Sequence, residues 1–175
     1  YIWSIRNTYV NENFISHKIM NVTLKFFSRF IPDIIIANSY SGKKSYVNYG
    51  YENNKIKVIG NGIDLQIYNY DFDLRTSFRK KFGYDDRTIL IGIIGRFDEN
   101  KGYRNFILAS KIISKFESNC HFIIVGDGSN EELNKIKLHI NELNMNDKFL
   151  IESPLSNLVG FYNGVDIITS ASVSE

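Results

Sequence analysis

Short apolar runs alternate with segments of helical periodicity along most of the chain. Such alternation is typical of βαβ units, in which a helix connects two parallel strands of one sheet. Several runs are apolar at consecutive positions, as expected of strands that are buried on both faces. The pattern therefore predicts an α/β fold with parallel sheets. The predicted strands are residues 1–5, 33–37, 57–59, 89–94, 121–125, 149–151 and 166–169, and the predicted helices are 14–30, 40–49, 102–116, 129–143 and 156–163.

Two of the predicted helices carry end signals in the sequence. Ser39 is placed to cap the helix at 40–49, and Gly50 suits the point where that helix stops. Ser129 and Glu132 form a capping box at the start of a later helix. These residues fix where the two helices are expected to begin or end.

The alternation is interrupted over residues 64–86, which are rich in Asp, Tyr and Phe and have no clean period. We place a domain boundary there. Residues 1–68 are predicted to be the carboxyl-terminal part of a first Rossmann-like domain, and residues 69–86 an interdomain linker. Residues 87–175 are predicted to be a second Rossmann-like domain that stops before its end. Both domains are thus expected to be incomplete.

The segment 14–30 has helical spacing of apolar residues beside a basic face that holds Lys18, Lys25 and Arg29. We expect its apolar stripe to face the core and its basic side to face solvent. A basic helix on a membrane surface is the second interpretation. The expected core-facing stripe consists of Ile15, Ile19, Val22, Phe26 and Phe30.

The chain of 175 residues has a formal net charge of +2, which gives no electrostatic footprint for nucleic acid. Residues 1–70 nevertheless hold eight Lys or Arg against four Asp or Glu. This asymmetry agrees with chance, and it also agrees with a first part that faces an anionic acceptor or a membrane surface. Peripheral membrane contact through the N-terminal part therefore stays open.

Several other classes of protein are disfavoured by what the sequence lacks. No stretch reaches the roughly 18 consecutive apolar residues of a membrane span. The single cysteine, Cys120, has no partner for an internal disulfide and fits a reducing cytoplasm. No Cys and His cluster has metal-ligand spacing, and neither a G-x-S-x-G elbow nor a Walker loop occurs. We therefore expect no metal site.

A loop with two cations follows the predicted strand at 89–94. Gly95 allows a ligand to approach the backbone closely, and Arg96 and Lys101 lie near the start of the next helix. Cations at a helix N-terminus suit a diphosphate, which needs neutralising charge and N–H donors. Ordinary surface charge explains the same residues equally well.

Three further segments end strands in small or polar residues. Residues 126–128 read Gly-Asp-Gly, which suits a nucleotide loop but also a tight turn between a strand and a helix. Residues 60–64 form a turn that lines an interdomain cleft or redirects the chain. Residues 166–175 lead to Glu175, which either caps a helix or accepts hydrogen bonds from sugar hydroxyls.

Taken in their order along the chain, the motifs from about Asp33 to Glu175 resemble those of glycosyltransferase family 4. The succession is IIANS, VIGNGID, GRF-x-x-x-KG, IIVGDG and FYNGVDIITSASVSE. The opening YIWSIRN resembles the preceding strand of bacterial members. The resemblance implies a GT-B fold, with two Rossmann-like parallel-sheet domains. The sequence departs from the family pattern at Gly60, Ser153 and Ala171, where Pro, Gly and Pro are common.

The resemblance also implies roles for individual residues. Arg96 and Lys101 match the pair that holds the donor's diphosphate. Glu175 matches the first Glu of the E-x(7)-E motif, which contacts the donor sugar, so these three are the implied catalytic residues. The implied donor site further includes Gly95, Gly126, Asp127, Gly128 and Ser172, and the implied interdomain cleft includes Asn61, Gly62 and Asp64.

The function that the resemblance implies is a retaining transfer of sugar from a UDP-, GDP- or ADP-sugar to a hydroxyl, without cofactor or metal. The acceptor would be a saccharide or a lipid-linked molecule of bacterial cell-surface polysaccharide or glycolipid synthesis. The expected location is the cytoplasm, including the inner face of the cell membrane. Because the second Glu of the motif lies beyond Glu175, we expect this chain to be inactive by itself. A sugar-nucleotide 2-epimerase and a non-catalytic sugar-nucleotide-binding protein are the alternatives.

Overall fold

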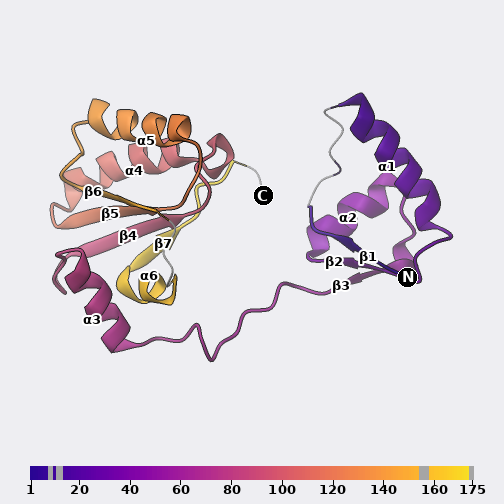
Figure 1. Ribbon diagram of the computed structural model, residues 1–175, viewed down its shortest axis with the longest axis horizontal. Helices are drawn as coiled ribbons and strands as arrows, with labels where there is room; N and C mark the ends of the chain where they lie inside the picture. The colour runs from indigo at the N-terminus through magenta and orange to yellow at the C-terminus, as the bar shows by residue number, and fades with distance from the viewer. Residues whose placement is uncertain (8–9, 11–13, 154–157, 174–175) are drawn as a thin grey trace. The chain divides into compact units, whose positions relative to one another are not determined.

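A computed structural model describes residues 1–7, 10, 14–153 and 158–173 of the chain. The fold divides into two compact units, Tyr1–Ile63 and Asp64–Ser174. Each unit has its own parallel sheet (Figure 1). The expected α/β fold with two parallel sheets is therefore confirmed.

The first unit is built on three parallel strands in the order β1-β2-β3. Its small core lies between this sheet and α2, and includes Ile35, Ile56 and Tyr51. The Ser39 hydroxyl accepts a hydrogen bond of 3.0 Å from the Gly42 N–H and caps α2, as expected. The elements are β1 (Ile2–Ile5), α1 (Ile15–Ser28), β2 (Ile34–Ala37), α2 (Tyr40–Tyr49), the 3-10 turn η1 (Asn53–Lys55) and β3 (Ile56–Val58), and α2 ends at Gly50, whose φ is 110°.

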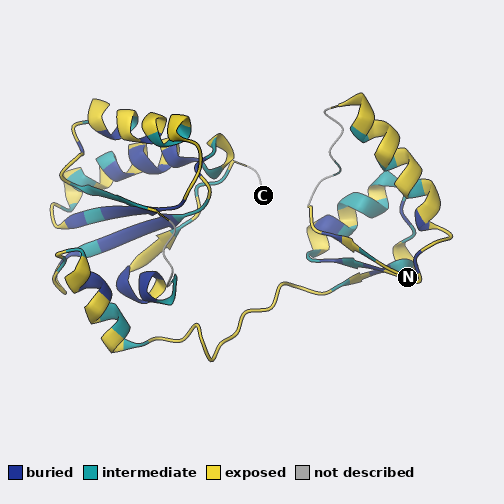
Figure 2. Ribbon diagram, viewed as in Figure 1, coloured by how far each residue is buried: buried dark blue, intermediate teal, exposed yellow. Residues whose placement is uncertain are grey.

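The expected orientation of α1 is wrong. All five residues of the predicted core-facing stripe are exposed, at 53–79% of their surface (Figure 2). The side of α1 that meets the rest of the unit instead carries His17, Asn21, Lys25 and Ser28, which are half-buried or buried. The Lys25 ammonium lies 5.1 Å from the centre of the Tyr49 ring, a cation–π distance. Periodicity revealed the stripe but not the side of the helix that would be covered.

The second unit contains four parallel strands in the order β6-β5-β4-β7. Helices α4 and α5 cover one face of this sheet, and α3 and α6 cover the other (Figure 1). The elements are α3 (Phe72–Lys81), β4 (Ile89–Ile94), the 3-10 turn η2 (Glu99–Lys101), α4 (Tyr103–Phe116), β5 (Cys120–Val125), α5 (Asn130–Glu142), β6 (Phe149–Glu152), α6 (Leu158–Gly164) and β7 (Ile167–Thr169).

Alternate residues of the central strands serve the two faces of this sheet. Phe122 and Ile124 pack under α4 and α5, whereas Ile123 and Val125 pack against α3 and α6. All four are fully buried. Burial on both faces explains why the strands read as uninterrupted apolar runs in the sequence.

Helix α3 lies within the segment that showed no clean period. Asp71 caps it by accepting a hydrogen bond of 2.9 Å from the Leu74 N–H. Its inward residues are Phe78 and Arg79, both buried. Because a charged residue occupies a core-facing position, no apolar stripe marks this helix in the sequence.

Candidate functional site

Two loops of the second unit are bonded to each other at the carboxyl edge of its sheet. One follows β4 and begins at Gly95, and the other follows β5 and begins at Gly126. The Gly95 N–H donates to the Val125 carbonyl at 3.0 Å, and the Phe97 N–H donates to the Asp127 carbonyl at 2.6 Å. This edge of a parallel sheet is where ligands bind in such folds. The backbones of the two predicted loops are thus hydrogen-bonded to each other along this edge.

The glycines of the second loop are required by close packing. A β-carbon on Gly126 would lie 1.9 Å from the Gly95 carbonyl oxygen. One on Gly128 would lie 2.7 Å from the Phe97 Cβ. Both distances are far below van der Waals contact, so side chains there would separate the loops.

Both predicted cations lie on the first loop. The Arg96 side chain is 81% exposed, and its guanidinium is 3.7 Å from the Asp98 carboxylate. The same carboxylate accepts a hydrogen bond of 3.2 Å from the Lys101 N–H and closes the turn η2. The Lys101 side chain is half-buried and runs alongside Gly95. The loop between β4 and α4 therefore carries two cations, Arg96 and Lys101.

The segment after β7 packs against this turn. Gly102 ends η2 with a φ of 66°, and a β-carbon on it would lie 1.9 Å from the Ala171 carbonyl oxygen. The Val173 N–H donates to the Asn100 carbonyl at 2.8 Å. Ser172, between these two contacts, is half-buried.

The structure thus brings seven of the predicted site residues to one edge of the second unit's sheet. Glu175 lies outside the described residues. Asn61 and Gly62 lie near the end of the first unit. Asp64 begins the second unit, where its carboxylate accepts a hydrogen bond of 2.9 Å from the Gln66 N–H. All three are exposed. The seven are Gly95, Arg96, Lys101, Gly126, Asp127, Gly128 and Ser172.

Sequence reasoning missed Tyr103, the first residue of α4. It is 4% exposed, and its hydroxyl donates a hydrogen bond of 2.7 Å to the Gly95 carbonyl. Burial raises its pKa, and the carboxylates of Asp98 and Asp127 add to the rise. In the sequence, this residue is marked by its position directly after the Lys101-Gly102 pair, but nothing there indicates its contact with Gly95.

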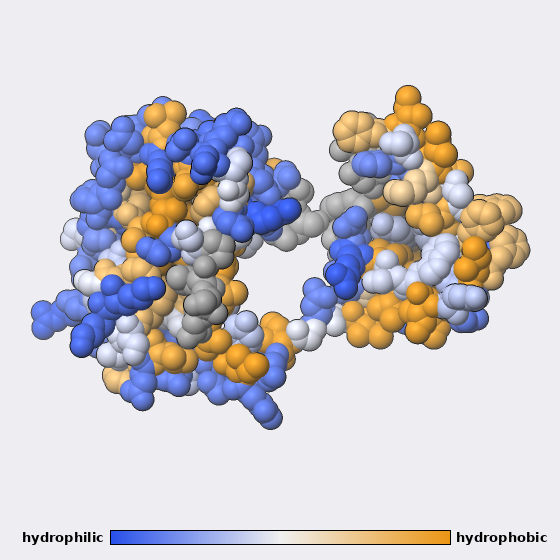
Figure 3. All heavy atoms as spheres, viewed as in Figure 1, coloured by the Kyte–Doolittle hydropathy of each residue, from blue (hydrophilic) through white to orange (hydrophobic). Residues whose placement is uncertain are grey.

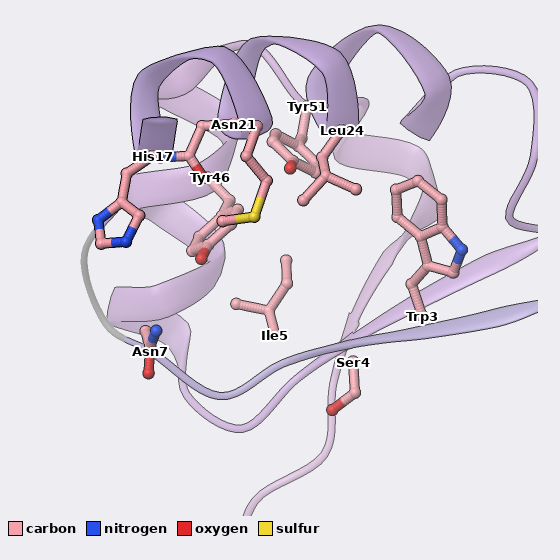
Figure 4. A pocket seen from close by; sticks show the side chains of 10 residues that line it. Trp3, Ser4, Ile5, Asn7, His17, Asn21, Leu24, Tyr46 and Tyr51 are labelled. Atoms are coloured by element: carbon pink, nitrogen blue, oxygen red, sulfur yellow. The ribbon is translucent and has the colours of Figure 1, made fainter. Parts of the chain in front are cut away.

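A second feature that the sequence did not indicate is a cavity of about 470 Å³ in the first unit (Figure 4). The Nδ1 atom of His17 is buried and has no hydrogen-bond partner within the described part of the chain. Burial raises the pKa of Tyr51 to about 12, with smaller effects of Tyr46 and Tyr49. The lining residues are Trp3, Ser4, Ile5, Asn7, His17, Met20, Asn21, Leu24, Tyr46 and Tyr51.

Within residues 1–7, 10, 14–153 and 158–173, no group of three or more His, Cys, Asp or Glu side chains could hold a metal ion. Among the helices described, none is long and apolar enough to cross a membrane.

The two units, each with its own parallel sheet, define a protein of the GT-B type. The Anabaena protein Alr3699/HepE, solved in complex with UDP and glucose, matches with a TM-score of 0.80 and 18% identity. The match covers 98% of this chain and 46% of that protein. Residues 75–175 match the family described as glycosyl transferases group 1. The chain belongs to this family.

Two curated relatives extend the comparison. A Klebsiella pneumoniae protein, described as an uncharacterized 41.2 kDa protein in cps region, is 34% identical over 110 residues, which are 60% of this chain and 28% of that protein. The D-inositol 3-phosphate glycosyltransferase of Corynebacterium jeikeium is 26% identical over 153 residues, which are 82% of this chain and 36% of that protein. The chain thus spans less than half the length of each protein named here.

Proposed function

We propose that this protein is a retaining glycosyltransferase that moves a sugar from a nucleoside-diphosphate sugar to a hydroxyl group. The observation that carries the proposal is the loop between β4 and α4, which carries Arg96 and Lys101 and is hydrogen-bonded to the loop after β5. Family membership and the UDP and UDP-glucose complexes of the Anabaena protein support it.

The chemistry depends on where charge develops during transfer. The bond from sugar to diphosphate breaks as positive charge builds on the sugar ring and negative charge on the leaving group. Preorganised cations aimed at that leaving group lower the barrier, and one such contact contributes about 3 kcal/mol. The Arg96 guanidinium can bind two phosphate oxygens at once, whereas Lys101 acts as a point charge. Ser172 and Glu175 are proposed to complete the donor site on the sugar side.

We assign the acceptor to the first unit, within the proposed domain of residues 1–68. The cavity there combines the rings of Trp3 and Tyr46 with polar groups of Asn7 and His17 (Figure 4). Aromatic rings beside hydrogen-bonding groups occur in sites for small organic ligands. The acceptor is proposed to be a saccharide or lipid-linked molecule of bacterial polysaccharide or glycolipid synthesis. The cps-region description of the Klebsiella relative supports this setting.

Calorimetric titration with UDP, GDP and ADP, without added metal, tests the donor site. We expect one nucleotide to bind and its affinity to fall at least about tenfold in Arg96→Ala, because a charged hydrogen-bond donor is lost. Arg87→Ala is the matched control. Arg87 is also exposed, but it precedes β4 and so lies at the opposite edge of the sheet. Binding of the same affinity in Arg96→Ala would contradict the assigned role.

Product analysis with the full-length protein distinguishes the proposed transferase from the two alternatives. Sugar transfer to an acceptor hydroxyl supports the proposal. Conversion of the nucleotide sugar without an acceptor would identify a 2-epimerase, and binding without either reaction would identify a sugar-nucleotide-binding protein.

Peripheral membrane contact is proposed for α1. Figure 3 shows apolar surface along this helix, and residues 1–70 carry the excess positive charge noted in the sequence. An exposed apolar stripe with nearby Lys and Arg suits an anionic lipid surface. We expect co-sedimentation with anionic vesicles, weakened by Phe26→Glu but not by Leu138→Glu, an equally exposed position on α5. Equal sedimentation of both variants would contradict this proposal.

A further inference from the structure

The peptide between Gly95 and Arg96 is held from two sides. The Gly95 carbonyl accepts the 2.7 Å hydrogen bond from the Tyr103 hydroxyl, and it also lies against Gly126, where a β-carbon would be 1.9 Å away. The Gly95 N–H is occupied by the Val125 carbonyl at 3.0 Å. Gly95, the first residue of the loop that carries Arg96 and Lys101, is thus fixed in orientation by α4 and by the loop after β5.

This orientation has a consequence for the next amide. In a planar trans peptide, the carbonyl and the following N–H point in opposite directions. Because the Gly95 carbonyl points to Tyr103 and Gly126, the Arg96 N–H points away from them. It donates to no carbonyl of the described residues. Backbone N–H groups beside a helix N-terminus are donors for phosphate oxygens.

The structure assigns Tyr103 as a positioning residue for the donor's diphosphate. Its hydroxyl fixes the Gly95 carbonyl, and thereby sets the direction of the Arg96 amide and the start of the Arg96 side chain. This assignment rests on the proposed function and deepens it, because it concerns the diphosphate rather than the nucleoside.

The surroundings of Tyr103 suit a fixed hydrogen-bond donor. The side chain is buried, and its ring meets the Phe97 ring edge to face at 5.7 Å between centres. Burial raises the pKa of the hydroxyl, so the proton stays in place at neutral pH. The ring packs into the core under α4, and the hydroxyl alone reaches the loop.

Tyr103→Phe separates the hydroxyl from the ring. We expect the affinity for the nucleoside diphosphate that the wild type binds to fall about fivefold to tenfold, the scale of one lost hydrogen bond. Affinity for the corresponding monophosphate should change less than twofold. If the Tyr103 hydroxyl only stabilised the fold, the ratio of diphosphate to monophosphate affinity would be unchanged in the variant at a temperature well below unfolding.

Tyr84→Phe is the matched control, since Tyr84 is a half-buried tyrosine of the same unit whose ring packs on His121 at the start of β5. We expect both of its affinities to equal those of the wild type. Equal diphosphate affinity in Tyr103→Phe and wild type would overturn the assignment of Tyr103. A wild type that binds none of the nucleotides would instead overturn the donor site itself. Monophosphate binding by Tyr103→Phe confirms that the tested sample is folded.

Discussion

The Arg79 guanidinium donates a hydrogen bond of 3.2 Å to the Asp166 carboxylate and joins α3 to the start of β7. Arg79 is only 1% exposed, and it also donates to the Gly164 carbonyl at 2.9 Å and to the Asp85 and Thr88 carbonyls. Asp166 additionally accepts from the Leu90 N–H at 2.8 Å. An ion pair between the buried Arg79 and the partly exposed Asp166 therefore ties a helix to two strands.

Removing the charge of Asp166 should destabilise the second unit. In Asp166→Asn, the buried Arg79 loses its nearer counter-charge, and because Asp166 itself is partly exposed we expect a loss of about 2 kcal/mol in the free energy of unfolding. Denaturant unfolding measures this. Asp86→Asn is the control, because that carboxylate is 73% exposed and 3.9 Å from the same guanidinium. It should cost less than about 1 kcal/mol. Equal losses in the two variants would contradict the stabilising role assigned to Asp166.

The same carboxylate should contribute to the acid sensitivity of the fold. Burial by itself raises the pKa of Asp166, but the Leu90 N–H and the guanidinium groups of Arg75 and Arg79 outweigh it and lower the pKa overall. A lowered folded-state pKa means that the stabilisation is complete above the unfolded value of about 3.9 and is lost as pH falls through the folded value.

Unfolding measured from pH 7 down to pH 3 checks this linkage. We expect the wild type to lose stability at the acid end, and Asp166→Asn to lose less over the same range. Part of the slope should persist in the variant, because hydrogen bonds from Thr88 also lower the pKa of Asp85. Parallel curves for the two proteins would show that Asp166 does not contribute.

The strands and most helices were predictable because their signals are local. Fully buried strands read as apolar runs, and Ser39 and Gly50 mark the ends of α2 by their own chemistry. The side of α1 that is covered was not predictable, since it depends on which surfaces of the chain lie beside it. Helix α3 was not predicted because its inward residue Arg79 is charged, and two of its partners, the Gly164 carbonyl and the Asp166 carboxylate, are distant in sequence.

The candidate site divides in the same way. The glycines and the two cations were visible as a motif at strand ends, whereas the contacts that hold them together were not. The hydrogen bond from Tyr103 to Gly95 joins a helix to the end of a strand, and residue spacing in the sequence does not predict it. The Ala171 carbonyl that requires a glycine at position 102 comes from a segment far along the chain.

Of the glycines in the loop between β4 and α4, Gly102 should be the most sensitive to substitution. Gly102→Ala places a β-carbon on a residue with a φ of 66° and 1.9 Å from the Ala171 carbonyl oxygen. Gly83→Ala is the matched control, because its φ is 76° but its β-carbon would have no neighbour within 4 Å. We expect about 1–2 kcal/mol of destabilisation from the backbone conformation at Gly83, and a clearly larger loss at Gly102. Equal losses in denaturant unfolding would mean that the contact with Ala171 is not rigid.

In the full-length protein, Arg96→Lys should impair turnover without affecting the fold. The variant keeps the positive charge but loses the planar fork that binds two phosphate oxygens, so we expect kcat/KM for the nucleotide sugar to fall about tenfold or more. Stability should stay within about 0.5 kcal/mol, because the Arg96 side chain is 81% exposed and its pair with Asp98 spans 3.7 Å. Arg87→Lys, at the opposite edge of the sheet, should match the wild type in both measurements. Wild-type turnover in Arg96→Lys would show that charge is sufficient at this position and that two-point binding of phosphate is not part of the mechanism.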